Sequence, residues 1–238
     1  MGDRLQQKET GYSRSFLLPV EGSVTGTGTV SSKGIKSAAR MVEGGSEEDM
    51  MRLEPIEHPE SLKMRLAYAY AKRRFGKVIT PMKVVYARIP EVLAMSKAMA
   101  TFMESGMVLE PGLRLLIMHL VGTRNQCGFC MDISRAQWIS SGGVPDKFDA
   151  IEAYATSPLF SDSERAALAY AEEVNRTRDA SDETFEALRR HFNEREIVEI
   201  TWCIAAENFY NFLNRPMGIE SDGLCALAEA KKKEGAVT

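Results

Sequence analysis

The sequence predicts an all-α fold, and two observations carry this prediction. From Leu62 onward, apolar residues recur every three or four positions, which is the spacing of an amphipathic helix. Helix-start signals such as Ser161 and Ser181, each followed by acidic residues, also occur in this region, whereas no convincing series of strands appears after residue 60. We therefore expect a helical domain whose connections contain glycine and proline.

The first expected helices lie before residue 106. The amphipathic pattern that begins at Leu62 stops near Gly76. Apolar residues from Val84 onward predict further helix, and Pro90 opens a new one, because proline is tolerated in the first helical turn. An apolar stripe on that helix favours core packing or an oligomer contact over a cofactor site; it consists of Met95, Met99, Phe102 and Met103.

The later helices surround a pair of cysteines. An apolar run from Leu113 to Val121 predicts a buried helix, and Met131 to Trp138 again reads as helix. Ser161 and Ser181 are expected N-caps of two more helices. A last long helix is expected from Glu194 to Leu213, and Pro216 and Gly218 after it are expected to prevent the helix from continuing.

Three regions differ in composition. Eight of the eighteen glycines fall within the first 45 residues, so residues 1–52 are expected to form a flexible N-terminal extension. A short β-element from Ser23 to Val30 is the alternative for part of it. Residues 53–225 are expected to form the helical domain, and residues 226–238, with Lys231 to Lys233, a charged C-terminal tail.

The overall composition is that of an ordinary soluble protein. With 26% charged residues and a formal net charge of −3, the chain offers no electrostatic reason to expect nucleic acid or an anionic membrane as partner. No stretch approaches the roughly 18 consecutive apolar residues of a transmembrane helix. The first residues lack the apolar core of a secretory signal, so the expected location is cytoplasmic.

The sequence Cys127-Gly128-Phe129-Cys130 is the strongest chemical signal in the chain. Two thiols at this spacing can close a disulfide, bind a soft metal or react with a substrate. The helices predicted on both sides place them at a helix start, where free backbone N–H groups and the helix dipole favour a thiolate. This placement indicates redox chemistry.

No cofactor or metal site is expected. A structural zinc site needs four ligands at characteristic spacing, and Cys203 and Cys225 show no such relation to the histidines. Cys203 is expected to be a small buried hydrophobic residue. No glycine-rich motif for binding a nucleotide or a flavin is visible.

Two segments give the chain a resemblance to a known family. "NQCGFCMDI" and "HFNEREIVEITWCIAAENFYNFLNR" resemble the carboxymuconolactone decarboxylase / alkylhydroperoxidase D-like superfamily over about residues 60–220. The resemblance implies a helical bundle completed by homo-oligomerisation. In its peroxidase branch, the two cysteines reduce a hydroperoxide and end as a disulfide that a thiol donor re-reduces. The resemblance also implies that Cys130 attacks the peroxide and that Cys127 resolves the intermediate.

The chain departs from the family at two positions of the proton relay. The positions of the family's glutamate and histidine are occupied by Leu115 and Ser134. His119 lies four residues after Leu115, on the same helical face, so we advance the hypothesis that it accepts the thiol proton. The alternative is a buried histidine with a structural hydrogen bond. Asp132 is a further candidate, with a structural role at the helix start as its alternative.

The expected function is a thiol-dependent peroxidase or disulfide oxidoreductase. It would act on a small-molecule peroxide or disulfide and take electrons from a thiol reductant. A non-enzymatic redox sensor or remnant family member is one alternative. A decarboxylase-type lyase acting on a small organic acid is another, although that branch generally lacks the cysteine pair. Glu207 and Asn208 could line the thiol cavity, but the sequence does not show in which direction they point, so they are left out of the predicted site.

Overall fold

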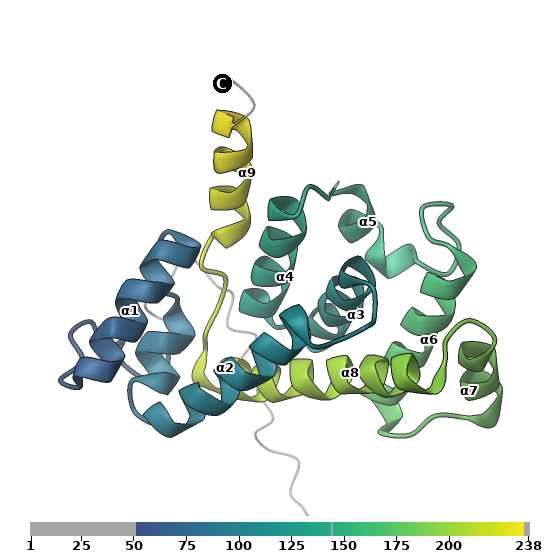
Figure 1. The fold of residues 1–238 in the computed structure, drawn as a ribbon, viewed down its shortest axis with the longest axis horizontal. Helices are drawn as coiled ribbons and strands as arrows, with labels where there is room; N and C mark the ends of the chain where they lie inside the picture. The colour runs from purple at the N-terminus through teal and green to yellow at the C-terminus, as the bar shows by residue number, and fades with distance from the viewer. Residues whose placement is uncertain (1–50, 144, 236–238) are drawn as a thin grey trace, which may run out of the picture. The chain divides into compact units, whose positions relative to one another are not determined.

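The computed structural model describes residues 51–143 and 145–235, and in these ranges it contains helices and no strand (Figure 1). The predicted all-α class is thus confirmed. The predicted extension up to residue 50 and its alternative β-element lie outside the described residues. The helices are α1 (Leu62–Phe75), η2 (Met82–Tyr86, a single π-turn), α2 (Pro90–Ser105), α3 (Pro111–Arg124), α4 (Gly128–Ser140), α5 (Asp146–Asp149), η3 (Ile151–Ala153), α6 (Asp162–Thr177), α7 (Asp182–Arg189), α8 (Glu194–Asn214), η4 (Arg215–Met217) and α9 (Leu224–Gly235).

The helix starts follow local capping chemistry. Ser161 and Glu164 form a capping box at α6, in which each side chain accepts a hydrogen bond from the other residue's backbone N–H. Ser181 caps α7 by accepting from Thr184 N. Pro90 occupies the first turn of α2 as predicted. Gly76 ends α1 with φ of 85°, a left-handed conformation that glycine adopts without a steric penalty.

Helix α3 lies at the centre of the bundle, in contact with α4, α6 and α8 (Figure 1). Its residues Leu116, Ile117, Leu120 and Val121 have no exposed surface. They belong to a core that also includes apolar residues of α6 and α8. A second core joins α1, η2 and α9 to the cysteine end of α4, and Cys127 and Cys130 belong to it. The cysteine pair is therefore part of the second core, at the start of α4.

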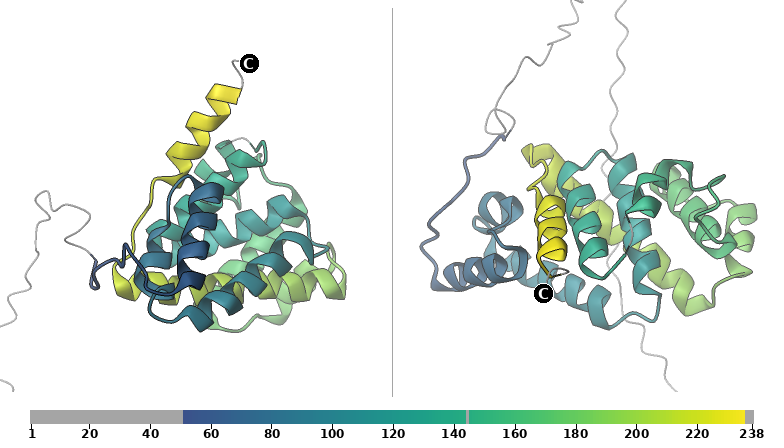
Figure 2. Two further views of the ribbon diagram at one scale, coloured as in Figure 1. Left: turned by 60° about the vertical axis from the view of Figure 1, so that its left-hand side comes forward. Right: turned by 90° about the horizontal axis from the view of Figure 1, so that it is seen from above.

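Helix α9 is an element that the sequence analysis missed. The sequence predicts a last long helix that ends near Leu213 and a charged tail from residue 226. In the structure, residues 226–235 continue α9, which packs against α4 (Figure 2). The predicted tail boundary falls inside this helix. The physical reason is a long-range contact: the carboxylate of Asp132 on α4 accepts hydrogen bonds from the backbone N–H groups of Asp222, Leu224 and Cys225.

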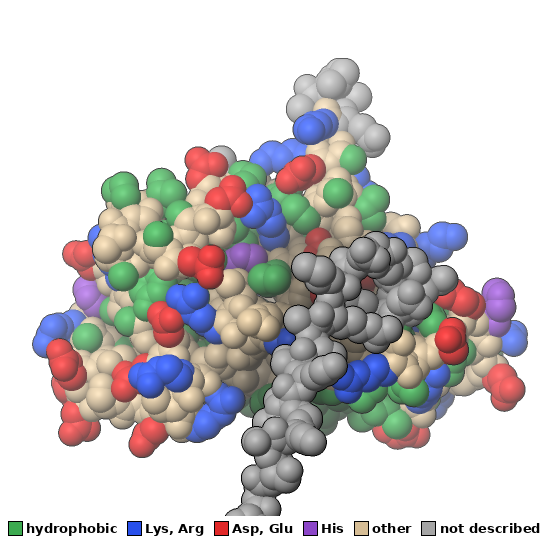
Figure 3. Space-filling view, turned by 180° about the vertical axis from the view of Figure 1, so that it is seen from behind, with side chains coloured by type: hydrophobic (Ala, Val, Ile, Leu, Met, Phe, Trp, Pro, Cys, Tyr) green, Lys and Arg blue, Asp and Glu red, His purple; other side chains and the backbone are tan. Residues whose placement is uncertain are grey.

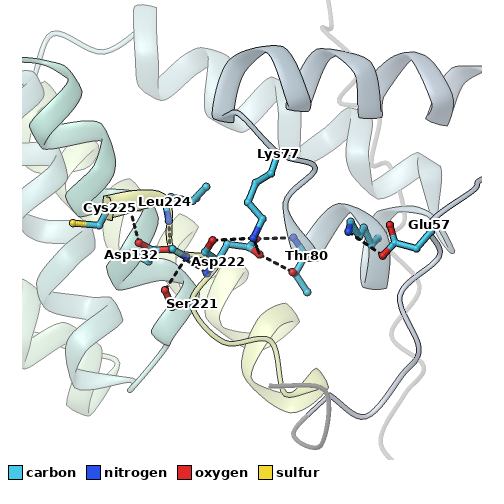
Figure 4. Close-up of polar contacts among 10 residues, drawn as sticks. Glu57, Lys77, Thr80, Asp132, Ser221, Asp222, Leu224 and Cys225 are labelled. Carbon is cyan, nitrogen blue, oxygen red and sulfur yellow. Dashed lines mark hydrogen bonds and ion pairs between the residues drawn. The ribbon is translucent and has the colours of Figure 1, made fainter. Parts of the chain in front are cut away.

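A second carboxylate fastens the same segment to the other side. Asp222 accepts from Thr80 N at 2.7 Å and from Thr80 Oγ1 at 2.8 Å, and it pairs with Lys77 Nζ at 3.0 Å (Figure 4). The connection between η4 and α9 is thereby tied both to α4 and to the loop after α1. It runs across the start of α4, next to the cysteines.

The surface carries charge of both signs. On the face shown in Figure 3, acidic and basic side chains alternate, and hydrophobic side chains lie between them. None of the helices in the described ranges is long and apolar enough to cross a membrane. Large apolar side chains are nevertheless exposed on α2 and α8; they include Met95, Phe102, Val198, Trp202 and Phe212.

Candidate active site

Cys127 and Cys130 lie at the start of α4, as predicted. Cys127 is the N-cap residue and Cys130 belongs to the first turn. The chain reaches this position through a tight turn after α3 in which Gln126 has φ of 54°, and Cys127 N donates to Gly122 O at 2.8 Å. The two cysteines form a disulfide with their Cα atoms 5.2 Å apart. Cys127 is fully buried and Cys130 is 2% exposed, so the sulfur atoms lie beneath the surface.

Two asparagine amides from α8 face the sulfur of Cys130. Asn211 Nδ2 donates to Sγ at 3.1 Å, and Asn214 Nδ2 lies at 3.5 Å from the same atom. Hydrogen bonds to a charged group are stronger than those to a neutral one, so these donors favour the thiolate form once the disulfide is reduced. In the described part of the chain no side-chain donor is directed at the sulfur of Cys127. The surroundings of the two sulfur atoms are thus unequal.

A buried carboxylate completes this side of the site. Glu207 is 3% exposed and lies one turn before Asn211 on α8. Its Oε1 accepts from Asn211 Nδ2 at 2.7 Å, so one amide group donates to both Glu207 and Cys130. Burial raises the pKa of Glu207 to about 7, and the hydrogen bond from Asn211 only partly offsets this effect.

Gly122 of α3 is the point where the carboxylate and the cysteine come close to one another. A Cβ atom at this position would lie 3.3 Å from Glu207 Oε1 and 3.4 Å from Cys130 Cβ. The absence of a side chain at Gly122 therefore leaves room for both groups. The sequence analysis leaves Glu207 out of the predicted site, although Glu207, Asn211 and Asn214 have the spacing of one helical face and could have been found as a row of polar side chains.

An asparagine cluster orients the amide of Asn211. Asn125, from the turn before Cys127, donates through Nδ2 to Asn211 Oδ1 at 2.7 Å and to Asn208 Oδ1 at 3.1 Å. Asn175 of α6 donates to Asn125 Oδ1 at 3.0 Å and accepts from Asn208 Nδ2 at 2.8 Å. Because Oδ1 of Asn211 is held by Asn125, its Nδ2 is directed at Glu207 and Cys130. Asn208 does not contact the sulfur itself but hydrogen-bonds to Asn125 and Asn175, which belong to the same cluster.

His119 is buried on α3 and contacts Ser134, the residue at the family's histidine position. The distance between His119 Nδ1 and Ser134 Oγ is 3.0 Å, and Ser134 Oγ also lies 2.9 Å from Cys130 O. Burial, together with the charge of Arg135, lowers the pKa of His119 to about 4, so the ring is neutral near pH 7. No hydrogen bond joins His119 to either sulfur atom within the described residues. Its role as proton acceptor stays a prediction.

The other sequence candidates lie away from the sulfur atoms. Asp132 holds the start of α9, which is a structural role, although it caps α9 and not its own helix α4 (Figure 4). Cys203 is fully buried, and burial raises the pKa of its thiol to about 12. Leu115 packs against the main core. Among residues 51–143 and 145–235, no cluster of three or more His, Cys, Asp or Glu side chains could hold a metal ion.

The segment between η4 and α9 covers the start of α4. A Cβ atom at Gly128 would lie 2.5 Å from Glu220 Oε2 and 3.4 Å from Ser221 N. Ile219 in the same segment is 1% exposed. A side chain at position 128 would displace the carboxylate of Glu220, so the segment lies directly against the turn that carries the two cysteines.

Comparisons with known proteins identify relatives of this chain by sequence and by fold. No protein-family model matches the chain. The uncharacterized protein YnjA of Escherichia coli is 31% identical over 162 residues, which are 67% of this chain and 88% of YnjA. A solved structure from Agrobacterium tumefaciens, of unknown function and provisionally named an antioxidant defence protein AhpD, is 28% identical with a TM-score of 0.55 and covers 58% of this chain and 96% of its own.

A third relative shows that this fold supports other chemistry as well. The debrominase Bmp8, solved as a cysteine-to-alanine variant in complex with 2,3,4-tribromopyrrole, has a TM-score of 0.65 and covers 76% of this chain and 98% of its own. Its identity is 16%, so this likeness concerns the fold alone.

The sequence match to YnjA, the likeness to the AhpD structure and the buried CxxC disulfide all lead to one assignment. The chain belongs to the alkylhydroperoxidase D-like family.

Proposed function

We propose that this protein is a thiol-dependent oxidoreductase that reduces hydroperoxides by cycling Cys127 and Cys130 between dithiol and disulfide. The observation that carries the proposal is the buried disulfide at the start of α4, with two amide donors directed at Cys130 Sγ. The name of the Agrobacterium relative, which refers to antioxidant defence, supports the same chemistry. A small-molecule disulfide is the alternative oxidant.

The proposed cycle has three steps. The Cys130 thiolate attacks a peroxide oxygen, the O–O bond breaks, and the alcohol leaves with a proton while Cys130 becomes a sulfenic acid. The Cys127 thiol then attacks the sulfenic sulfur, so that water leaves and the disulfide forms. A thiol donor finally supplies two electrons and two protons and restores both thiols. Because this last step needs a reducing compartment, we propose a cytoplasmic location.

The hydrogen bonds of the site support Cys130 as the nucleophile. A hydrogen bond to a charged group contributes about 1.5–3 kcal/mol, whereas a helix N-terminus contributes about 0.3–1 kcal/mol at an exposed site. The helix dipole acts on both cysteines, since Cys127 is the N-cap of α4 and Cys130 lies in its first turn. The amides of Asn211 and Asn214 act on Cys130 alone. The larger effect therefore distinguishes the two thiols and favours attack by Cys130.

His119 is connected to the cysteine pair through the hydroxyl group of Ser134. Its ring nitrogen meets the Ser134 hydroxyl, which in turn lies at hydrogen-bond distance from the backbone carbonyl of Cys130. We propose that His119 is a positioning residue that holds the first turn of α4, rather than the group that touches the sulfur.

We also propose that the protein forms a homo-oligomer. Apolar residues follow one face of α8 at alternating spacings of four and three, as in a helix that packs against another helix. They are Val198, Trp202, Ala205, Phe209 and Phe212, and three of them, Val198, Trp202 and Phe212, are large and exposed. An apolar face of this length on a soluble protein typically marks a protein contact. A second copy of the chain, meeting the same face of α8, is the proposed partner.

Steady-state turnover is the test of the function. We expect saturable consumption of an organic hydroperoxide with dithiothreitol as reductant, and loss of turnover in both Cys130→Ser and Cys127→Ser. A sulfenic acid should be trapped in Cys127→Ser and be absent in Cys130→Ser. A single oxidation without turnover would identify a redox sensor instead. Activity on an organic acid that survives both substitutions would identify a lyase, and preferential consumption of a bromopyrrole would identify a dehalogenase.

A further inference from the structure

Helix α8 buries a carboxylate that the packing of the fold does not explain. Glu207 has no ion pair with lysine or arginine within the described residues, and the hydrogen bond that it accepts comes from Asn211. Glu199 on the same helix is buried as well, but it accepts from Val108 N and Leu109 N and pairs with Arg195. Burying an unpaired carboxylate costs free energy, and such groups concentrate at reactive sites.

The position of Glu207 connects it to the reactive sulfur. One amide group, Asn211 Nδ2, lies 2.7 Å from Glu207 Oε1 and 3.1 Å from Cys130 Sγ. Gly122 faces both residues without a side chain that would separate them. Asn211 itself is held in one orientation by Asn125. A carboxylate, an amide and a thiol therefore meet in a region closed to bulk water.

We infer that Glu207 is the proton acceptor and donor of the dithiol, and that Asn211 is the positioning residue between them. This inference rests on the proposed function. The Cys130 thiol gives its proton to the Glu207 carboxylate and becomes the thiolate. As the thiolate attacks the peroxide and the O–O bond breaks, the carboxyl group gives this proton to the departing oxygen, which leaves as an alcohol. The Glu207 carboxylate is then restored, and no further reactant is needed.

The environment of Glu207 suits transfer in both directions. With its pKa raised to about 7 by burial, the carboxyl group exchanges a proton near neutral pH. Few titratable groups surround Glu207: its charge acts on Cys203 and Tyr210 of α8, and Cys130 of α4 shares the amide of Asn211 with it. On α3, Gly122 faces Glu207, while Arg114 acts on the same Cys203. From α6, the neutral amide of Asn175 enters the neighbouring cluster. The pH response should therefore be attributable to Glu207.

The first experiment measures thiol reactivity without peroxide. In a reduced Cys127→Ser background, the rate of Cys130 alkylation by iodoacetamide is followed from about pH 5.5 to 9, with and without Glu207→Gln. The acid group should produce an inflection near pH 7, which the amide variant lacks. Glu199→Gln, a buried carboxylate on the same helix, is the matched control and should keep the inflection. Identical profiles with and without Glu207→Gln would overturn the inference.

The second experiment measures the chemical step. With otherwise wild-type reduced protein, stopped-flow oxidation by cumene hydroperoxide should be about 100-fold slower in Glu207→Gln, the usual size of a general acid–base contribution. Glu207→Asp, which retains the acid, should recover part of the rate. Equal rates in wild type and Glu207→Gln would overturn the inference. If wild type is not oxidised at all, the proposed peroxidase function fails, while the alkylation profile still decides the role of Glu207.

Discussion

Asn211→Ala removes the amide that donates to both Cys130 Sγ and Glu207 Oε1. The hydrogen bond to Sγ is 3.1 Å long and buried, so its loss should cost the thiolate more than the neutral thiol. We take about 1.5 kcal/mol, the lower end for a bond to a charged group, because sulfur is a weak acceptor. At a pH below the pKa of the Cys130 thiol, this free energy corresponds to about a tenfold smaller thiolate fraction.

The assay is alkylation of Cys130 by iodoacetamide at about pH 7 in a reduced Cys127→Ser background. Asn211→Ala should react about tenfold more slowly than the background protein, since the thiolate is the reactive species. Asn175→Ala is the matched control, because it breaks the asparagine cluster without touching sulfur. It should react within about twofold of the background. Equal rates for Asn211→Ala and the background, or a larger effect of Asn175→Ala, would refute this reasoning.

Four further predictions concern α9, His119 and the α8 face. Asp132→Ala removes the acceptor of three backbone N–H groups at the start of α9, so hydrogen exchange in α9 should accelerate and stability should fall by about 2–4 kcal/mol; unchanged protection would contradict this role. The pKa of His119 is lowered to about 4 in the folded protein, so between about pH 6.5 and 4 the unfolded chain binds a proton at this residue more readily than the folded chain does. Acidification from about pH 6.5 to 4 should therefore lower the free energy of unfolding of wild type by on the order of 3 kcal/mol. In His119→Gln, the free energy of unfolding measured with urea should fall less steeply over the same pH range. In the same variant, peroxide-driven oxidation between about pH 6 and 8 tests the sequence hypothesis of a proton acceptor, which equal rates would exclude. Trp202→Glu with Phe212→Glu should reduce the molar mass measured by light scattering, and an unchanged mass would locate the oligomer contact elsewhere.

Local chemistry explains which parts of the fold were predictable. A capping box such as Ser161 with Glu164 is formed within one helical turn, and a proline such as Pro90 restricts its own backbone. The same is true of the cysteines, because a CxxC at a helix start needs only the helix that follows it. These features depend on neighbours in the chain, so their spacing alone indicated them.

Helix α9 and the role of Asp132 depended on contacts over long sequence distances. Asp132 meets Cys225 across 93 positions, and nothing in the residues around Asp132 indicates that partner. A short segment rich in lysine at the end of a chain is equally compatible with a solvated tail. Only the docking of the segment on α4, with its N–H groups satisfied by a carboxylate, distinguishes the helix from the tail.

The sequence by itself determined the helical class, the family and the Cys127–Cys130 pair at a helix start, because each follows from the spacing of residues along the chain. The tertiary structure decided what surrounds the sulfur atoms. It brought Asn211 and Asn214 to Cys130, directed Glu207 toward Gly122, and gave His119 a hydroxyl partner in Ser134. The physical reason is rotation of a helix about its axis: spacing shows which residues share a face, and only packing against α3 and α4 determines where that face points.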